Sequence, residues 1–572
     1  MPEMRQADAG QADAAQADAG QADAGQADAG RADAGRAVRM MKPVGWALAA
    51  WLVLLAAFAV NGAPLFYFDT AGYFDIGGKM LHLLDRFRPE AAAAAATAEA
   101  PDGTVLGSRS AVYALIAALF LQLNALWALV LLQAAALVLA LHLVCRLVLA
   151  PTGRVALAWP ATAAAALAAA LGSAGFFTAF LMPDIFAAIL LLSIAGLAAF
   201  APDLRRGSAL ALLALGALAV VLHLSHLAIA LLAVPGAALA CLAFGNRRWW
   251  LSVLLVALIA ATGLVERMAF TFSVETATRE HVIYLPFFTA RLIADGPGKA
   301  YLDATCPKAG ADSGPESGAE SGPESGAESG AAPAMATCAL NEKLLRPEQL
   351  APDRILFATN PKFGSYALLS PEQQRRIADE QRAFLQAVVI ARPLAVIGAA
   401  LRHTVAQLGL VSIDMTLASP QMAESAHRIY PGFPDSLTQG RLTGQHLTGQ
   451  NLTGQNLTGE HLTGQNLTGG TWVASLTRLH QIYYALSGLA LVALLVLPQS
   501  RLPRRLRLFG VLVLLGILAN AFVTGAIAQP ANRYGARVIF LIPAVLVLLV
   551  MARPVASPVA RPVASPGREA RP

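Results

Sequence analysis

Residues 184–201 read DIFAAILLLSIAGLAAFA, and no further charge follows Asp184 before Asp203. A helix needs about 20 such apolar residues to cross the hydrocarbon core of a bilayer. Runs of this kind recur along the chain, at residues 44–61, 126–149, 155–172, 184–201, 208–223, 226–244, 250–266, 478–498, 507–527 and 537–552. The sequence therefore predicts an all-α polytopic membrane protein with about 10 transmembrane helices, joined by periplasmic loops and membrane-surface helices.

The composition supports a membrane protein and excludes a nucleic-acid binder. Of the 572 residues, 56% are hydrophobic and only 14% are charged, against roughly 25% charged residues in an ordinary soluble protein. The net charge is +6, but the arginines are scattered at the ends of apolar runs. A nucleic-acid binder would gather them on one face.

The charges between the runs predict the topology. Short basic connections, such as Arg205-Arg206 and Arg247-Arg248, occur at every second boundary. The positive-inside rule places them in the cytoplasm, together with both termini. We expect a bacterial inner membrane protein whose first apolar run is a retained anchor, because the N-terminal tail is too long and polar for a signal peptide.

The chain divides into five regions. They are a disordered cytoplasmic repeat tail (1–43), an N-terminal membrane core (44–266) with the first periplasmic loop (62–125), a periplasmic region (267–477), C-terminal membrane helices (478–552) and a disordered cytoplasmic tail (553–572). The periplasmic region contains a low-complexity insertion (309–333) and pentapeptide repeats (441–470). The repeats are too few to stack on a shared core, which favours a flexible loop over an ordered β-coil.

Two cysteines flank the insertion in the periplasmic region. Cys306 and Cys338 are expected to form a disulfide, because this region is placed in an oxidising compartment. Two free thiols are the alternative.

The first periplasmic loop opens with acidic residues. Residues 61–75 read NGAPLFYFDTAGYFD, with carboxylates at Asp69 and Asp75. An acidic cluster at a membrane exit provides no positive charge for anchoring, but it suits a catalytic base. Asp75 is either a second catalytic acid or a solvated neighbour.

Three further positions on the predicted outer face carry candidate site residues. Asp184 begins an apolar run, where an acid is costly unless paired or solvated; an N-cap role is the alternative and is compatible with function. Arg533 and Arg537 oppose the positive-inside bias and suit either phosphate or loop carboxylates. His223 and His226 could bind an anion or a metal, or line a cavity. Two histidines are too few for a metal site, so no cofactor is expected, and a divalent metal has no ligand set to support it.

A long amphipathic stretch lies farther along the periplasmic region. Residues 372–411 contain Arg392, Arg402 and His403 among many apolar positions. This pattern predicts a helix on the outer membrane surface.

The first-loop acid Asp69, the Pro183-Asp184 pair and the Arg533-Tyr534 turn resemble the GT-C class of integral membrane glycosyltransferases. Members join a multi-span core to periplasmic loops, carry a catalytic acid in the first loop and use polyprenyl-phosphate-linked sugars. Many have two adjacent acids there, whereas Thr70 follows Asp69 here.

The resemblance implies a role for each candidate residue. Asp69 would be the base, with Asp75 or Asp184 orienting the acceptor or substituting for it. Arg533 and Arg537, with Arg109 as a third, would bind the lipid phosphate. The aromatic residues that could stack on sugar faces are Tyr73, Tyr113 and Tyr534.

Two rival functions remain open for the chain. A transporter or flippase would carry charged or Pro/Gly-interrupted residues within its spans, whereas the runs here are mostly plain Ala, Leu and Val. A non-catalytic partner in cell-envelope polysaccharide assembly would suit the large region 267–477. The expected partners are thus the lipid bilayer and a polyprenyl-phosphate-linked sugar, and the sequence sets no oligomeric state.

Overall fold

A computed structural model describes residues 42–86, 104–278, 281–306, 335–344, 346–443 and 471–553. The insertion 309–333 lies outside the described residues. So do nearly all of the two predicted tails (1–41 and 554–572) and most of the pentapeptide repeats (444–470).

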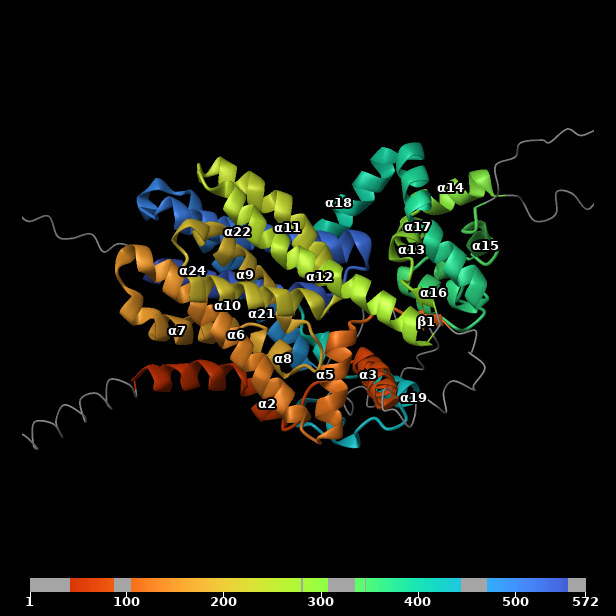
Figure 1. Ribbon diagram of the computed structural model, residues 1–572, viewed down its shortest axis with the longest axis horizontal. Helices are drawn as coiled ribbons and strands as arrows, with labels where there is room; N and C mark the ends of the chain where they lie inside the picture. The colour runs from red at the N-terminus through yellow and green to blue at the C-terminus, as the bar shows by residue number, and fades with distance from the viewer. Residues whose placement is uncertain are drawn as a thin grey trace, which may run out of the picture.

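The larger part of the chain is a body of packed helices (Figure 1). It begins with a helix over Lys42–Leu54. The helices that follow in this body are α2 (Ala56–Asn61), α3 (Phe68–Arg86), α5 (Ala111–Gln122), α6 (Leu126–Leu149), α7 (Ala158–Ala170), α8 (Ala174–Ala179), α9 (Ile185–Phe200), α10 (Arg206–Val221), α11 (Leu224–Ala243), α12 (Trp249–Thr278), α19 (Pro420–Ile429), α21 (Thr471–Val496), α22 (Arg504–Phe522), α23 (Asn532–Ile539) and α24 (Leu541–Met551). A π-helical turn, η9 (Val523–Ile527), continues α22.

A second group of helices gathers at one end of this body, right of the long helices in Figure 1. We call it the outer unit. Its elements are α13 (Phe287–Ala294), α14 (Pro297–Thr305), α15 (Cys338–Asn341), α16 (Pro352–Phe357) and α17 (Pro371–Ala391). The outer unit has its own apolar core around Ile293, Leu302 and Phe384, separate from that of the body. Helix α18 (Pro393–Gly409) leads from it back to the body.

The described residues confirm the all-α class and contain several helices suited to a membrane. By length and composition, seven helices could cross a bilayer, or eight if α17 and α18 form one bent span. The seven are Leu126–Thr152, Ile185–Asp203, Leu224–Ala243, Trp249–Ala277, Trp472–Val496, Arg504–Ile527 and Asn532–Met551.

The predicted count of about 10 spans is not confirmed. Three of the predicted spans fall on shorter helices, Lys42–Leu54, Val155–Ala170 and Arg206–Val221, each of 10–17 residues. At a rise of about 1.5 Å per residue they reach at most about 26 Å, against a hydrocarbon core of about 30 Å.

Helix α9 is the centre of the body. Of its apolar window, 94% is buried inside the structure, against 22% for α12. A helix that is apolar all round must be surrounded by other helices or by lipid, and α9 is surrounded by α6, α10 and α22 (Figure 1). Asp184 comes directly before this buried helix.

Two features depart from the sequence-based picture. The stretch 372–411 is not one surface helix but two, α17 and α18, which meet at Arg392 with a bend of 107°. The proline at 393 explains the break, because a proline disfavours helical conformation in the residue before it. A small parallel ribbon, β1 (Thr104–Leu106) with β2 (His281–Ile283), joins the end of the first loop to the segment after α12.

Cys306 and Cys338 are joined by a disulfide, with Cα atoms 5.5 Å apart. The bond connects the end of α14 to the start of α15, so it joins the two segments of the outer unit that the insertion separates in sequence. The other two cysteines, Cys145 and Cys241, are buried in the body.

Close packing of α3 on α5 fixes the first loop. A Cβ atom added at Gly77 on α3 would overlap the backbone of Ala114 and the side chain of Ala118 on α5. A Cβ atom at the neighbouring Gly78 would meet nothing within 4 Å among the described residues. Gly77 therefore sets how closely the helix that carries Asp69 approaches the helix that follows Arg109.

This difference gives a matched pair of substitutions. We expect Gly77→Ala to lower the free energy of unfolding by about 1–3 kcal/mol, because it overpacks the α3–α5 contact. Gly78→Ala should be neutral or stabilising by up to about 1 kcal/mol, because alanine favours a helix more than glycine does. Thermal or denaturant unfolding of the two purified variants in detergent measures the difference, and equal stabilities would contradict this account of the contact.

Candidate functional site

The first loop is held against the segment that precedes α9. Leu65 and Phe180 form a parallel β-bridge, in which the Leu65 N–H donates to Ala179 (2.8 Å) and the Leu181 N–H donates to Leu65 (2.8 Å). The Thr70 hydroxyl donates to the Leu181 carbonyl at 3.2 Å. These bonds place the N-terminal turn of α3 beside the start of α9. Thr70, which follows Asp69, thus has a structural role of its own.

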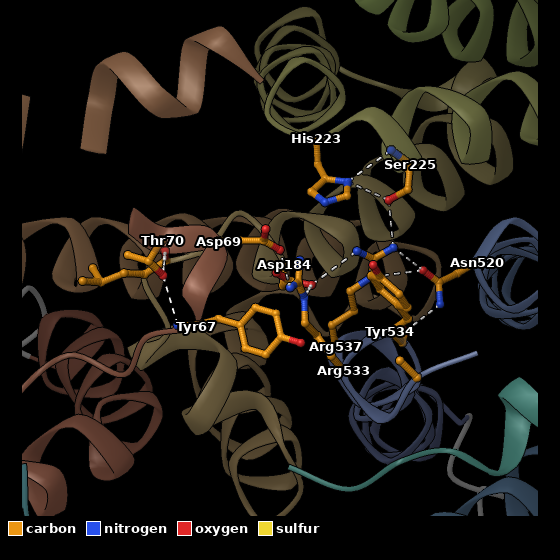
Figure 2. A network of polar contacts seen from close by, with 12 residues as sticks. Tyr67, Asp69, Thr70, Asp184, His223, Ser225, Asn520, Arg533, Tyr534 and Arg537 are labelled. Carbon is orange, nitrogen blue, oxygen red and sulfur yellow. Dashed lines mark hydrogen bonds and ion pairs between the residues drawn. The ribbon is translucent and has the colours of Figure 1, made fainter. Parts of the chain in front are cut away.

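Asp69 lies between two arginines from distant parts of the chain, Arg109 and Arg533. Figure 2 shows Asp69 in one cluster with Asp184 and Arg533. Its Oδ1 accepts from Arg109 Nη2 at 2.8 Å, and its Oδ2 accepts from Arg533 Nη1 at 3.3 Å. Gly72 leaves room for the Arg109 guanidinium, whose Cζ would lie 2.8 Å from an added Cβ. The side chains of Asp69 and Arg109 are 25% and 29% exposed, whereas that of Arg533 is 4% exposed. Asp69 and Arg109 therefore form the accessible edge of this cluster.

Asp184 lies behind this edge and is fully buried. Its Oδ1 accepts from Arg533 Nε at 3.0 Å and from Arg537 Nη1 at 3.4 Å. Its side chain makes no capping bond to α9, so the N-cap interpretation is not what the structure shows. The Oδ2 atom has no partner among the described residues. Asp184 thus serves as the counter-ion of two arginines that are themselves buried.

A second layer of polar groups holds Arg537. Its Nη2 donates to Asn520 Oδ1 at 2.8 Å and to Ser225 Oγ at 3.0 Å. Asn520 in turn donates to the Tyr534 carbonyl at 2.8 Å. His223 Nδ1 lies 2.8 Å from Ser225 Oγ, which connects the start of α11 to the cluster (Figure 2). The Arg537 guanidinium is therefore fixed on several sides.

Aromatic rings flank the arginines. The Arg533 guanidinium carbon lies 5.1 Å from the centre of the Tyr67 ring and 5.4 Å from that of Tyr534. Arg537 is 5.0 Å from the Tyr534 ring. All three distances fit cation–π contacts, which favour a charged guanidinium in a poorly hydrated site.

Two of the predicted sugar-stacking residues pack elsewhere. Tyr73 and Tyr113 meet edge to face with ring centres 5.0 Å apart, and both are buried. The Tyr113 hydroxyl bonds to Gln133 at 3.3 Å, and Gln133 donates to the Thr178 carbonyl at 3.0 Å. In this structure neither ring presents a face to a sugar, and the pair fixes α5 against the body.

Asp75 and His226 lie apart from the cluster. Asp75 faces outward from α3 and pairs with Lys79 at 2.8 Å, which matches the solvated-neighbour interpretation. His226 is buried and its Nδ1 bonds to the Ala219 carbonyl at 2.7 Å. Its ring centre is 5.1 Å from that of His223. Among the residues that the structure describes, no group of three His, Cys, Asp or Glu side chains could hold a metal ion.

The charges of the cluster set the protonation of its accessible groups. Burial raises the pKa of Asp69, but Arg109 and Arg533 outweigh it and hold that pKa below its ordinary value. Burial, together with the charges of Arg537 and Arg533, lowers the pKa of His223 well below its usual range. At neutral pH the site therefore contains a carboxylate, fixed guanidiniums and a neutral imidazole.

Several members of the network are not among the sequence-predicted residues. Asn520 interrupts an apolar run. It could have been predicted as a site residue, because a polar residue inside a span is costly and often functional. Tyr67 and Ser225 carry weaker signals, because an aromatic or a serine at a loop edge is common. Their roles depend on packing between segments that are far apart in sequence.

The fold and the site define an all-α protein with several helices suited to a membrane and a buried Asp–Arg cluster near their ends. Comparison with known proteins adds no family name, because no family model, curated protein or solved structure matches the chain. The geometry of the cluster is therefore the basis for inferring what the protein does.

The cluster gives a stability prediction. Asp184→Asn should lower the free energy of unfolding by about 3–5 kcal/mol, because it removes a buried counter-ion while Arg533 and Arg537 stay charged. The matched control is Asp75→Asn, which removes an exposed ion pair and should change stability by at most about 1 kcal/mol. Unfolding of both variants in the same detergent tests this, and similar losses in both would show that Asp184 is not the buried counter-ion.

Proposed function

We propose that the protein is a membrane glycosyltransferase of the GT-C type, which moves a sugar from a polyprenyl-phosphate donor to a periplasmic lipid, glycan or protein. The observation that carries the proposal is the pairing of Asp69, an accessible carboxylate, with Arg109 and Arg533. A carboxylate suits proton removal from an acceptor hydroxyl. Guanidiniums suit a phosphate, which they can bind through two parallel hydrogen bonds.

The chemistry needs few groups. The acceptor oxygen forms a bond to C1 of the sugar, and the bond between C1 and the phosphate oxygen breaks. The hydroxyl proton passes to Asp69, and the electron pair of the broken bond leaves on the lipid phosphate. Arg109 and Arg533 stabilise the charge that develops there, while Asp184 keeps Arg533 in position from behind.

The same arrangement couples donor binding to base strength. With both oxygens paired to arginines, Asp69 has a lowered pKa and is a weak base. A donor phosphate would compete for Arg109, the more exposed of the two arginines. Losing that partner would raise the pKa of Asp69 toward a value better suited to proton removal. Donor binding would thus precede activation of the acceptor.

We further propose that the chain crosses the bacterial inner membrane about ten times with both termini in the cytoplasm. The three shorter helices pack beside helices that are long enough to span, such as α7 beside α24 and α10 beside α9. Local thinning of the bilayer would let them cross as well. The alternating basic connections supply the orientation.

A transporter or flippase is the second candidate, because the structure has one feature typical of such proteins. Helices α17 and α18 meet with a bend of 107°, and discontinuous helices often form transport sites. Against this, the cluster around Asp184 lies where α9 begins and in the first part of the candidate span Asn532–Met551, rather than halfway along them. The location of the charges therefore favours chemistry at one face.

Asp69→Asn tests the base directly. We expect sugar transfer from a polyprenyl-phosphate donor to fall by at least about 100-fold, the usual scale of acid–base catalysis, while membrane insertion stays intact. The measurement is transfer of a labelled sugar into periplasmic products by membranes that contain equal amounts of each variant. The control Asp75→Asn should keep its transfer. Full transfer by Asp69→Asn would contradict the assignment of Asp69 as the catalytic base. Movement of a solute across the membrane by the unmodified protein, without sugar transfer, would favour the transporter.

The arginine beside the base predicts a pH effect. Because Arg109 helps to lower the pKa of Asp69, kcat/KM should stay level as the pH falls through the ordinary carboxyl range near about 4. Arg109→Gln removes that cation, so the acid limb of the kcat/KM profile should move to higher pH. Arg109→Lys keeps the charge and should leave the limb near its original place. An unmoved limb in Arg109→Gln would argue against Asp69 as the titrating base.

A further inference from the structure

A hollow of about 380 Å³ lies where the outer unit meets α18, away from the Asp–Arg cluster. Its walls come from two segments. One is the turn before α14, and the other is the first half of α18 with its preceding residue. The lining residues are Asp295, Gly296, Pro297, Arg392, Leu394, Ala395, Gly398, Ala399 and Arg402.

The hollow has a positive character. Arg392 and Arg402 stand at its edge, both are exposed, and neither forms an ion pair with any residue that the structure describes. The acid in the lining, Asp295, is already neutralised by Arg291 at 2.6 Å, and His403 Nε2 lies within hydrogen-bond distance of its Oδ1 at 2.9 Å. The two arginines are therefore available to an outside anion.

The start of α18 adds to this character. The side chain of Arg392 does not cap the helix, so the N–H groups of Leu394 and Ala395 point out from the first turn without a side-chain acceptor. The N-terminal end of a helix attracts anions through such groups and through its dipole. Gly398 and Ala399 form a small-residue floor that leaves space for a headgroup.

An apolar stripe continues from the hollow along α18. Leu394 is 84% exposed, and Ile397, Leu401 and Val405 follow it at helical spacing with their side chains also exposed. The opposite face, with Ala399 and Gln407, is buried. A continuous exposed apolar stripe on one helix marks contact with a membrane or a partner.

The surroundings of α18 favour lipid as the occupant. The helix packs on α22 and η9, which form one of the candidate membrane spans. Helix α22 exposes Leu515, Leu518 and Phe522 on its own surface. The apolar stripe therefore lies next to a surface that lipid would cover, and the two arginines lie at the hollow where the stripe begins.

We propose that the hollow binds the phosphate headgroup of an anionic membrane phospholipid, whose acyl chains lie along the α18 stripe. Arg392, Arg402 and the free N–H groups of α18 hold the phosphate, while Leu394 and Ile397 contact the chains. The proposal is independent of the glycosyltransferase assignment, because it concerns a site that shares no residue with the Asp–Arg cluster.

Native mass spectrometry of the full chain in detergent tests the site with added phosphatidylglycerol or phosphatidylcholine. We expect phosphatidylglycerol to bind more tightly. The double variant Arg392→Ala/Arg402→Ala should weaken its binding by about tenfold or more, since each arginine near an anionic surface contributes about 1 kcal/mol. The matched control Arg376→Ala/Arg382→Ala removes two charges from α17 and should leave binding unchanged.

A second variant separates charge from shape. A Cβ atom at Gly398 would meet nothing within 4 Å in the described part of the chain, so Gly398→Phe should fold normally and fill the hollow while both arginines remain. It should weaken phosphatidylglycerol binding as the double variant does, with an unchanged thermal midpoint. Equal binding of the two lipids, or unaltered binding in both variants, would overturn the proposal. Displacement of the lipid by glycerol 3-phosphate at a similar concentration would also overturn it, because the site would then recognise a free phosphate.

Discussion

The buried carboxylate of Asp184 is the interaction on which the rest of the structure depends. Taking a charge out of water costs several kcal/mol even after relaxation, and only close partners offset that cost. Its partners, Arg533 and Arg537, lie about 350 positions farther along the chain, with separations of 349 and 353 residues. The pairing therefore ties the start of α9, the most buried helix, to the start of α23. Both halves of the body must assemble before either charge is satisfied.

The arginine side chains of the cluster become more exposed from Arg537, which is fully buried, through Arg533 to Arg109. Arg537 is held by Asn520 and Ser225 and cannot move without breaking several bonds. Arg533 shares Asp184 with Arg537 but also reaches Asp69. Arg109 stands at the edge. The inner groups are preorganised, whereas the outer pair can exchange partners with a ligand, and this combination is what stabilisation of a developing charge requires.

Much of this arrangement could be predicted from the sequence, because buried charge leaves a clear signal in an apolar chain. Asp69, Asp184, Arg533 and Arg537 stand out against apolar or loop surroundings, and the structure brings them together. Tyr73 and Tyr113 could not be distinguished from surface aromatics, because they are buried where α3 packs on α5, and the sequence does not show that the two helices meet.

The lengths and ends of the helices were harder to predict than the charged residues of the cluster. Apolar composition alone does not show whether a run such as 155–172 has the length to span, because short helices can pack on longer ones. The bend at Arg392 was missed for a related reason. The amphipathic pattern continues across it, and the sharp change of direction occurs at Pro393, after which α17, packed on α13 and α14, gives way to α18, packed on α22 and η9.

Helix α18 extends from the hollow that Arg392 and Arg402 line to the neighbourhood of the Asp–Arg cluster. Near its end, the Gln407 side chain donates to the Ala531 carbonyl at 3.0 Å and accepts from the Ala531 N–H at 2.9 Å. Ala531 is two residues from Arg533. From Arg402 to Gln407 the helix rises only about 8 Å, and a packed helix moves as a rigid element over that distance. Helix α18, which lines the hollow, is therefore tied by the Gln407 amide and by its packing on α22, η9 and α23 to the segment that positions Arg533.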